Sequence, residues 1–197
     1  IFMVVCPTSV LSHWEAKLEQ YCSELKTHLY HGPNRKLPEE KMNIVLTSYG
    51  TLRNDIHKFE RYSFDLFVLD EIQTLKNKST TAYKALKYLK SVVSIGLTGT
   101  PIENSTIDLK NLLDFVLPGF LPEDSEFKKR FVEPIELDNN VEVKHALSRL
   151  VGPFVLRRTK QQVLIELPEK IEDKRFCLLS DDQVKFYKEV IHNQGAK

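Results

Sequence analysis

The sequence predicts an α/β fold built on a doubly wound, mainly parallel sheet and followed by a helical extension. Short apolar segments alternate with helical patterns over the first two-thirds of the chain, which is typical of linked β–α–β units. Several of these segments are apolar at nearly every position, as in strands that are buried on both faces of a parallel sheet. The segments that we expect to be strands are 2–6, 28–31, 43–47, 66–70 and 92–97.

Amphipathic helices are expected between these strands. The first one places Leu11, Trp14 and Leu18 on one face, and Ser12 with Glu15 is expected to form a capping box at its start. Two later segments, 82–89 and 109–116, repeat apolar residues at helical spacing. These patterns support the doubly wound arrangement.

The character of the chain changes after Gly119, which together with Pro118 ends the helix before it. We therefore expect residues 1–118 to form the α/β unit and 119–166 to be a helical insertion, because that stretch is charged and lacks strand candidates. Residues 167–197 follow a Leu-Pro break and are expected to be a linker or the start of a further lobe, with a closing helix at 180–192.

Composition narrows the classes of function. The 28 Lys and Arg residues nearly balance the 27 Asp and Glu residues, so any surface for nucleic acid has to be a local patch. No segment approaches the roughly 18 apolar residues of a membrane span, so no membrane partner is expected. The three cysteines form no CxxC pair, which indicates a reducing compartment rather than a disulfide framework or a zinc site. The chain opens inside an apolar run without Met, so we expect it to be part of a longer protein.

An acidic pair follows the fourth expected strand. Asp70 and Glu71 come directly after four apolar residues, and a parallel strand delivers its last residues to the sheet edge where open α/β folds bind ligands. Burial and like charge both oppose ionisation of such a pair, so a binding role explains it better than chance. The alternative is a strand that simply ends in two solvated acids.

The next expected strand ends in a second polar segment. It contains Thr98, Gly99, Thr100 and Pro101, which offer hydroxyl groups and a close backbone approach. By itself this is an ordinary strand-to-helix turn. Beside the acidic pair it is expected to form a neighbouring wall of the same site.

Taken in order, these segments resemble the SWI/SNF-type ATPases of the superfamily-two helicases. The resemblance covers nearly the whole chain and rests on several motifs in the right order at plausible spacing. Pro7-Thr8-Ser9-Val10-Leu11 with Trp14 is similar to motif Ia, Thr47-Ser48-Tyr49 to the next strand-end motif, Asp70-Glu71-Ile72-Gln73 to the DEAH-type motif II, and Leu97-Thr98-Gly99-Thr100-Pro101 to motif III. Lys76-Asn77, Glu103-Asn104 and Leu156-Arg157-Arg158-Thr159-Lys160 also match the family pattern.

The resemblance implies a RecA-like first helicase lobe and a DNA-dependent ATPase that moves on duplex DNA. ATP and Mg²⁺ are the implied cofactors, with Asp70 holding Mg²⁺ through water and Glu71 acting on the hydrolytic water. The implied coupling residues between nucleotide and DNA are Gln73, Thr98, Gly99, Thr100 and Pro101. Motif II has Gln73 where His is commoner, and an amide donates and accepts hydrogen bonds without becoming charged.

Residues expected to contact DNA come from several of the motifs. Thr8 and Ser9 precede a helix, where free N–H groups suit a phosphate, although helix capping is the simpler alternative. The segment with Arg157 and Arg158 suits either phosphate contact or ion pairing between lobes. Tyr49 is expected in the core rather than stacked on a base. The full expected set is Pro7, Thr8, Ser9, Thr47, Ser48, Lys76, Asn77, Arg157, Arg158 and Lys160.

Two parts of such a motor are absent from the sequence. The phosphate-binding loop, G-x-x-x-x-G-K-[ST], is expected a few tens of residues upstream of Ile1, and the second helicase lobe with its arginine finger is expected after Lys197. The fragment by itself is therefore expected to be inactive. A non-catalytic platform for DNA or protein is the first alternative function. A methyltransferase is the second, although it requires a glycine-rich turn after the first strand. The expected location is intracellular, in a bacterial cytoplasm or a nucleus.

Overall fold

The computed structural model describes residues 1–38, 42–99, 105–158, 162, 173–174 and 177–194. Contacts between Cα atoms divide the chain into two compact units, Ile1–Pro153 and Phe154–Lys197. The first unit holds the sheet and most of the helices. The second contains one described helix of several turns, α10 (Asp181–Gln194), close to where the sequence predicts a closing helix.

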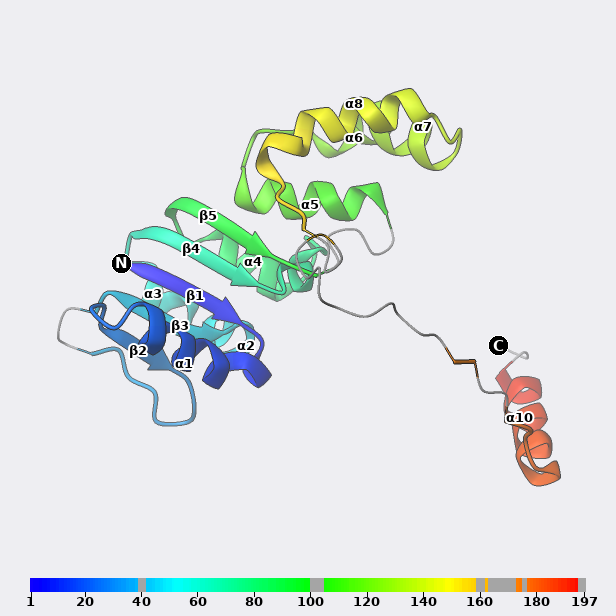
Figure 1. Ribbon diagram of the computed structural model, residues 1–197, viewed down its shortest axis with the longest axis horizontal. Helices are drawn as coiled ribbons and strands as arrows, with labels where there is room; N and C mark the ends of the chain where they lie inside the picture. The colour runs from blue at the N-terminus through cyan, green and yellow to red at the C-terminus, as the bar shows by residue number, and fades with distance from the viewer. Residues whose placement is uncertain (39–41, 100–104, 159–161, 163–172, 175–176, 195–197) are drawn as a thin grey trace. The chain divides into compact units, whose positions relative to one another are not determined.

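The first unit is built on a five-stranded parallel sheet with the order β2-β3-β1-β4-β5 (Figure 1). Its strands match the expected segments within two residues at each end. Their bounds are β1 Phe2–Cys6, β2 Thr27–Tyr30, β3 Ile44–Ser48, β4 Phe64–Asp70 and β5 Ser91–Leu97. Because every pairing is parallel, all five strands end at the same edge of the sheet. This confirms the expected α/β class.

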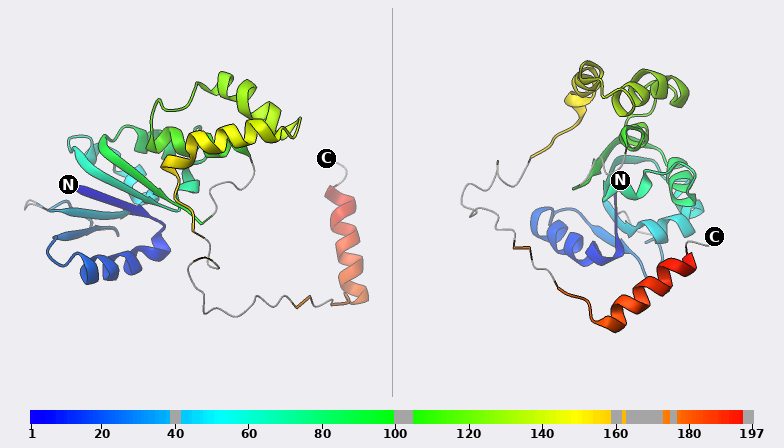
Figure 2. Two further views of the ribbon diagram at one scale, coloured as in Figure 1. Left: turned by 45° about the horizontal axis from the view of Figure 1, so that its top comes forward. Right: turned by 90° about the vertical axis from the view of Figure 1, so that its right-hand side faces the viewer.

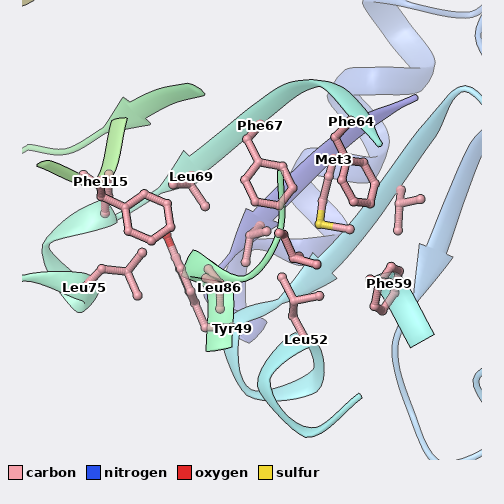
Figure 3. Packing of buried hydrophobic residues seen from close by; sticks show 14 of the residues in the cluster. Met3, Tyr49, Leu52, Phe59, Phe64, Phe67, Leu69, Leu75, Leu86 and Phe115 are labelled. Atoms are coloured by element: carbon pink, nitrogen blue, oxygen red, sulfur yellow. The ribbon is translucent and has the colours of Figure 1, made fainter. Parts of the chain in front are cut away.

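Helices cover both faces of the sheet (Figure 2). Helix α1 (Leu11–Tyr21) packs Leu11 and Leu18 onto one face. The other face is covered by α2 (Tyr49–Asn54), α3 (Ile56–Phe59), α4 (Thr81–Lys87) and α5 (Thr106–Val116). On that face a large cluster contains Phe67 of β4 and Leu52 of α2 (Figure 3). Alternate apolar side chains of the strands therefore pack into two separate hydrophobic clusters, one on each face of the sheet.

The beginning of α1 differs from the expectation. The chain turns through a short 3₁₀ segment, η1 (Thr8–Val10), and α1 begins at Leu11 with Val10 as its N-cap. Ser12 thus lies inside the helix, and the expected capping box of Ser12 with Glu15 is wrong. A turn of 3₁₀ helix at the N-terminus moves the cap towards the strand, which the local sequence pattern alone does not reveal.

A helical extension follows the sheet within the same unit. It consists of α6 (Asp124–Phe127), a π-helical turn η3 (Lys128–Val132), α7 (Glu133–Glu136), α8 (Val141–Val151) and the short η4 (Gly152–Phe154). Phe127, Phe131 and Leu147 form its own apolar cluster together with Leu113 of α5. Helix α5 is therefore shared between the sheet and the extension.

Two lysines and two aspartates join the extension to the sheet. Lys78, in the segment before α4, donates to Asp114 of α5 at 2.8 Å and to Asp124 of α6 at 2.6 Å. Lys110 of α5, whose exposed fraction is 2%, is 2.9 Å from Asp124 and also pairs with Asp114. Burial alone lowers the pKa of Lys78, but its hydrogen bonds to the two aspartates outweigh burial and raise it.

Strand β5 departs from the expectation of strands buried on both faces. Val92 is 78% exposed and Val93 is 50% exposed, and Ile95 and Leu97 are exposed as well. The reason is its position: β5 is an edge strand, and its Val93 and Ile95 lie outside the cluster that packs under α1, which reaches only as far as Val68 of the neighbouring strand β4.

Candidate functional site

The acidic pair lies where the sheet ends. Asp70 is the last residue of β4, and Glu71 follows it in the left-handed region with φ 51°. Non-glycine residues seldom adopt this conformation, and they do so most often at turns and functional sites. The turn leads directly into the 3₁₀ segment η2 (Ile72–Leu75). It therefore presents two carboxylates in succession at the carboxyl edge.

Both carboxylate oxygens of Asp70 accept hydrogen bonds from the protein. The indole Nε1–H of Trp14 donates to Oδ2 at 2.7 Å, and the backbone N–H of Glu71 donates to Oδ1 at 3.0 Å. The Tyr49 hydroxyl also donates to the backbone carbonyl of Asp70 at 2.8 Å. Asp70 is thus held by residues of α1 and α2 and by the backbone of the residue that follows it.

Two neighbouring residues have the raised pKa values expected of buried groups. Burial, with a smaller contribution from the charge of Asp70, raises the pKa of the Cys6 thiol to about 12. Burial also raises the pKa of the Tyr49 hydroxyl. Cys6 is completely buried, as the sequence predicts for a small apolar residue of β1. Tyr49 is 7% exposed and points into the core (Figure 3), which confirms the core interpretation.

Glu71, the second acid, is held by Gln73, the residue that replaces the commoner His of motif II. Gln73 Nε2 donates to Glu71 Oε2 at 2.5 Å, while Gln73 Oε1 is buried without a hydrogen-bond partner. An unpaired buried amide oxygen has a free-energy cost of about 1–3 kcal/mol. The geometry places Gln73 against the carboxylate that is expected to act on water.

The chemistry of this edge suits Mg²⁺. This ion prefers oxygen ligands, keeps several waters and commonly uses one or two carboxylates together with substrate phosphates. Asp70 provides such a carboxylate at a strand end. Among the described residues no group of three or more His, Cys, Asp or Glu side chains could enclose a metal, so an all-protein cage is not the arrangement present in that part of the chain.

The end of β5 lies beside the acidic pair. Leu97 is the register partner of Asp70, so Thr98 and Gly99 continue from the neighbouring strand at the same edge. The backbone of β5 also approaches η2 closely: a Cβ atom on Gly96 would lie 2.7 Å from Ile72 Cδ1. This brings motif II and the start of motif III together. Thr100 and Pro101, also expected in the coupling set, lie outside the described residues.

The segment after β1 reaches the same edge. Thr8 and Ser9 are exposed on η1, after the half-buried Pro7, and neither side chain caps a helix. The simple capping alternative for these two hydroxyls is therefore wrong. Both are accessible at the carboxyl edge of the sheet.

Thr47 and Ser48 have a different environment. Thr47 is completely buried, and its hydroxyl donates to the Tyr30 carbonyl at 2.8 Å. Ser48 is 3% exposed; its Oγ donates to the Thr51 hydroxyl and accepts from the Thr51 N–H as the N-cap of α2. Their side chains thus have structural roles, and a DNA contact at this strand end stays a prediction.

The remaining expected DNA contacts are scattered along the chain. Asn77 Oδ1 accepts from the N–H and the hydroxyl of Ser79, which closes a local turn, and the Lys76 carbonyl accepts from Asn111 at 2.7 Å. Arg157 and Arg158 are exposed in the second unit. Lys160 lies outside the described residues. The structure therefore brings only part of the expected set to one edge.

One charged network was not expected from the sequence. Asp55 Oδ2 accepts from the Tyr30 hydroxyl at 2.6 Å, from Arg35 Nε at 2.7 Å and from Lys58 Nζ at 3.3 Å. The Arg35 guanidinium, with help from Tyr30 and Lys58, holds the pKa of the Asp55 carboxyl well below its usual value. Two stretches of the chain that are 20 residues or more apart, 30–35 and 55–58, meet here, so no local motif predicts the network. It stabilises the β2 side of the sheet.

None of the helices among the described residues has the length and apolar content that crossing a bilayer requires.

The comparisons with known proteins confirm the family resemblance. Residues 1–197 match the family model for the SNF2-related domain. The chain is 36% identical over 197 residues to YwqA of Bacillus subtilis, a candidate ATP-dependent helicase/translocase, covering 96% of this chain and 21% of YwqA. It is 35% identical over 205 residues to the TATA-binding protein-associated factor mot1 of Schizosaccharomyces pombe, covering 96% of this chain and 10% of mot1.

Solved structures extend the similarity to three dimensions. The SWI2/SNF2 ATPase core of Sulfolobus solfataricus in complex with dsDNA has a TM-score of 0.76 and 39% identity, covering 98% of this chain and 41% of that chain. The SWI2/SNF2 ATPase core domain of Sulfolobus solfataricus in a second solved structure has a TM-score of 0.72 and 39% identity, covering 98% of this chain and 40% of that chain. This chain spans only part of each relative: about a fifth of YwqA and two-fifths of the archaeal core. The fold is RecA-like, and the chain belongs to the SNF2-related domain family.

Proposed function

We propose that this chain forms most of the first lobe of a DNA-dependent ATPase that couples ATP hydrolysis to movement along duplex DNA. One observation carries the proposal: the carboxyl ends of β1, β4 and β5 meet at one edge of a parallel sheet. There the Asp70–Glu71 pair lies at the same edge as the accessible hydroxyls of Thr8 and Ser9. A nucleotide site and a phosphate-backbone contact can share such an edge.

Each residue of the site has a definite part in this proposal. Asp70 would hold Mg²⁺ through water, and the ion would neutralise charge on the phosphates as they separate. Glu71 would orient the attacking water and accept its proton. Gln73, which donates to Glu71 at 2.5 Å, would hold that carboxylate until the site is complete. Thr98, beside the acids, and the adjoining Gly99, Thr100 and Pro101 would relay the nucleotide state to the DNA-facing side.

For the DNA-facing side we propose a contact that positions the backbone without identifying bases. Pro7, Thr8 and Ser9 form its centre, since the two hydroxyls are exposed and do not cap a helix. Contacts of this type are indifferent to sequence, which suits a protein that moves along any duplex. Further proposed contacts are Thr47, Ser48, Lys76, Asn77, Arg157, Arg158 and Lys160.

The open side of β5 supports the proposal that the longer protein supplies a neighbouring βα unit. Val93, Ile95 and Leu97 share one face and are between 38% and 50% exposed, which is unusual for a parallel strand. A unit that carries the phosphate-binding loop would cover this apolar face and bring the loop to the edge that holds Asp70. We propose that the chain by itself does not hydrolyse ATP, because the 197 residues contain no G-x-x-x-x-G-K-[ST] loop and we expect the arginine finger to come from a second lobe.

The decisive experiment measures ATP turnover by the longer protein with and without duplex DNA, in wild-type and Glu71→Gln forms. We expect DNA to stimulate the wild-type rate and Glu71→Gln to lower it by at least about 100-fold, the contribution typical of a general base. Glu19→Gln is the matched control, because Glu19 is an exposed residue of α1 away from the site. It is expected to leave turnover unchanged.

A specific result distinguishes the motor from the non-catalytic platform. If wild-type protein binds duplex DNA but neither it nor Glu71→Gln turns over ATP, the platform is the correct function. DNA-stimulated turnover by the 197-residue chain alone would contradict the proposal that the missing segments are required.

A further inference from the structure

Trp14 makes a polar contact that the roles above leave unused. It lies on α1, far from motif II in sequence, yet its Nε1–H donates to Asp70 Oδ2 at 2.7 Å. It is the only tryptophan of the chain. Motif Ia is otherwise represented at this edge by Thr8 and Ser9, which face outward, whereas Trp14 reaches inward to the acid.

Apolar packing alone does not account for a tryptophan at this position. Trp14 is partly buried and packs at the margin of the cluster that contains Leu11 and Leu18. Leucine or phenylalanine would fill an apolar helix position of this kind, but neither would donate a hydrogen bond. A partly buried indole typically directs its N–H to a specific acceptor. Here that acceptor is the carboxylate proposed to hold the metal.

The geometry fixes the orientation of the Asp70 carboxylate. Trp14 donates to one oxygen and the N–H of Glu71 donates to the other, so rotation of the carboxylate breaks at least one bond. An ionised carboxylate has about four lone-pair sites, and these two donors occupy one on each oxygen. One site on each oxygen is left for the water shell of a metal ion. The carboxylate is thus oriented before any ligand arrives.

We propose that Trp14 is a positioning residue that orients Asp70 for the metal–water shell through its indole N–H. This inference rests on the proposed function of Asp70. Residues that hold metal ligands commonly change metal affinity or activity by about 10–100-fold when they are replaced. Because α1 begins directly after the turn that carries Thr8 and Ser9, the same hydrogen bond ties the proposed DNA-facing segment to the metal carboxylate.

The first test follows Trp14 without measuring activity. The longer protein is labelled with 5-fluorotryptophan and titrated with MgCl₂ at a fixed concentration of a non-hydrolysable ATP analogue. The ¹⁹F resonance of Trp14 is identified by its loss in Trp14→Phe, or in the 197-residue chain, where it is the only tryptophan signal. We expect this resonance to shift with Mg²⁺ in wild-type protein and to be displaced and unresponsive in Asp70→Asn. Asp114→Asn, the equivalent change at an aspartate that pairs with Lys78 and Lys110 and not with Trp14, is expected to leave it unchanged.

The second test measures the Mg²⁺ dependence of ATP turnover in Trp14→Phe. Loss of the indole N–H is expected to raise the half-activating Mg²⁺ concentration by about 10-fold. Leu18→Ala is the control for packing, since it weakens the apolar contacts of α1 with the sheet while leaving the hydrogen bond of Trp14 in place. It is expected to lower thermal stability without moving the Mg²⁺ midpoint.

Two results would overturn the inference. One is a Trp14 resonance that is the same in Asp70→Asn as in wild-type protein and insensitive to Mg²⁺. The other is a Trp14→Phe enzyme with the wild-type Mg²⁺ midpoint. If Glu71→Gln abolishes turnover while Trp14→Phe behaves as wild type, only the role of Trp14 fails. If Glu71→Gln leaves turnover intact, the proposed function of the site fails as well.

Discussion

The two edge strands of the sheet, β2 and β5, differ in how far their residues are buried. On β2 the last residue, Tyr30, is completely buried and its hydroxyl joins the network of Asp55, Arg35 and Lys58. On β5 the apolar residues are exposed along the strand, with Val92 at 78%. Leu29 of β2 is 37% exposed, so β2 is covered only in part, but the more apolar β5 is covered less. The apolar composition of a strand therefore indicates how much burial its side chains favour, whereas only the tertiary structure shows how much burial they obtain.

The comparison gains force from β1, which lies two strands away from β5. Both strands contain consecutive valines, and both end at the same edge of the sheet. Val5 of β1 is completely buried between neighbouring strands, whereas Val93 of β5 is half exposed. The two valines lie on opposite faces of the sheet, since Val5 pairs with Leu69 and Val93 with Leu66, and they compare a residue of a central strand with one of an edge strand.

The largest effect is expected for Val5→Ala compared with Val93→Ala. In the 197-residue chain Val5→Ala should lower the free energy of unfolding by about 2.5 kcal/mol, because it removes buried methyl groups and leaves a cavity. Val93→Ala should cost no more than about 0.5 kcal/mol, as is usual for an exposed site. Urea denaturation of the two variants provides both values.

The same pair sharpens the comparison in the longer protein. If a neighbouring unit covers β5, the cost of Val93→Ala should rise towards that of Val5→Ala. Equal small costs in the chain and in the longer protein would show that β5 stays open, and would contradict the proposed position of the neighbouring unit.

The next largest effect is expected in the network of Asp55, Arg35 and Lys58 beside β2. Asp55→Asn should lower the free energy of unfolding by about 2 kcal/mol at pH 7, because hydrogen bonds to a charged acceptor are lost from a buried position. Arg35 and Lys58 would both lose their carboxylate partner. The measurement is urea denaturation, with Asp138→Asn as the control, since Asp138 is exposed.

The Asp55 network also predicts a dependence on pH. The Arg35 guanidinium is the main cause that lowers the folded-state pKa of Asp55 below its ordinary value of 3.8, so the contribution of Asp55 to stability is present above that value. It should be lost as the pH falls below about 4 towards the folded-state pKa. Wild-type protein should therefore lose more stability than Asp55→Asn between pH 6 and pH 3. Parallel losses in both proteins would be incompatible with the network.

The smallest effect is expected at the contact between β5 and η2. Gly96→Ala would place a Cβ atom 2.7 Å from Ile72 Cδ1, and Ile72 is 3% exposed, so the turn after Glu71 has to adjust. We expect a loss of about 1 kcal/mol, as for a modest overpacking. Gly50→Ala is the matched control: Gly50 lies in α2 with no atom near a Cβ, and alanine there should be neutral or stabilising. Thermal denaturation compares the two, and an equal response would exclude the close approach.

Local patterns predicted the strands and the motif positions well. The five strand segments, the helices at 82–89 and 109–116 and the closing helix all follow from apolar spacing, which the backbone period imposes directly. The acidic pair at the end of β4 was also predictable, because four apolar residues followed by Asp70 and Glu71 fix both the strand and its exit.

Side-chain partners were much less predictable. The sequence gives Thr8, Ser9, Thr47 and Ser48 equal standing as hydroxyls at strand ends, yet the first two are exposed and the last two are buried in hydrogen bonds. Lys110 has the charge of a surface residue but is 2% exposed beside Asp114. Partners that come from other segments decide these cases, and no local spacing contains them.

The sequence by itself determined that the chain forms an α/β sheet, that the acids Asp70 and Glu71 end a buried strand, and that its motifs are those of the SNF2-related family. These properties are local, because apolar period and residue order act over a few residues. Only the tertiary structure decided that Trp14 holds Asp70, that Gln73 holds Glu71, and that Val93 of β5 is half exposed while Tyr30 of β2 is completely buried. Each of these depends on which segments meet in space, and in a parallel sheet the strands that meet are far apart along the chain.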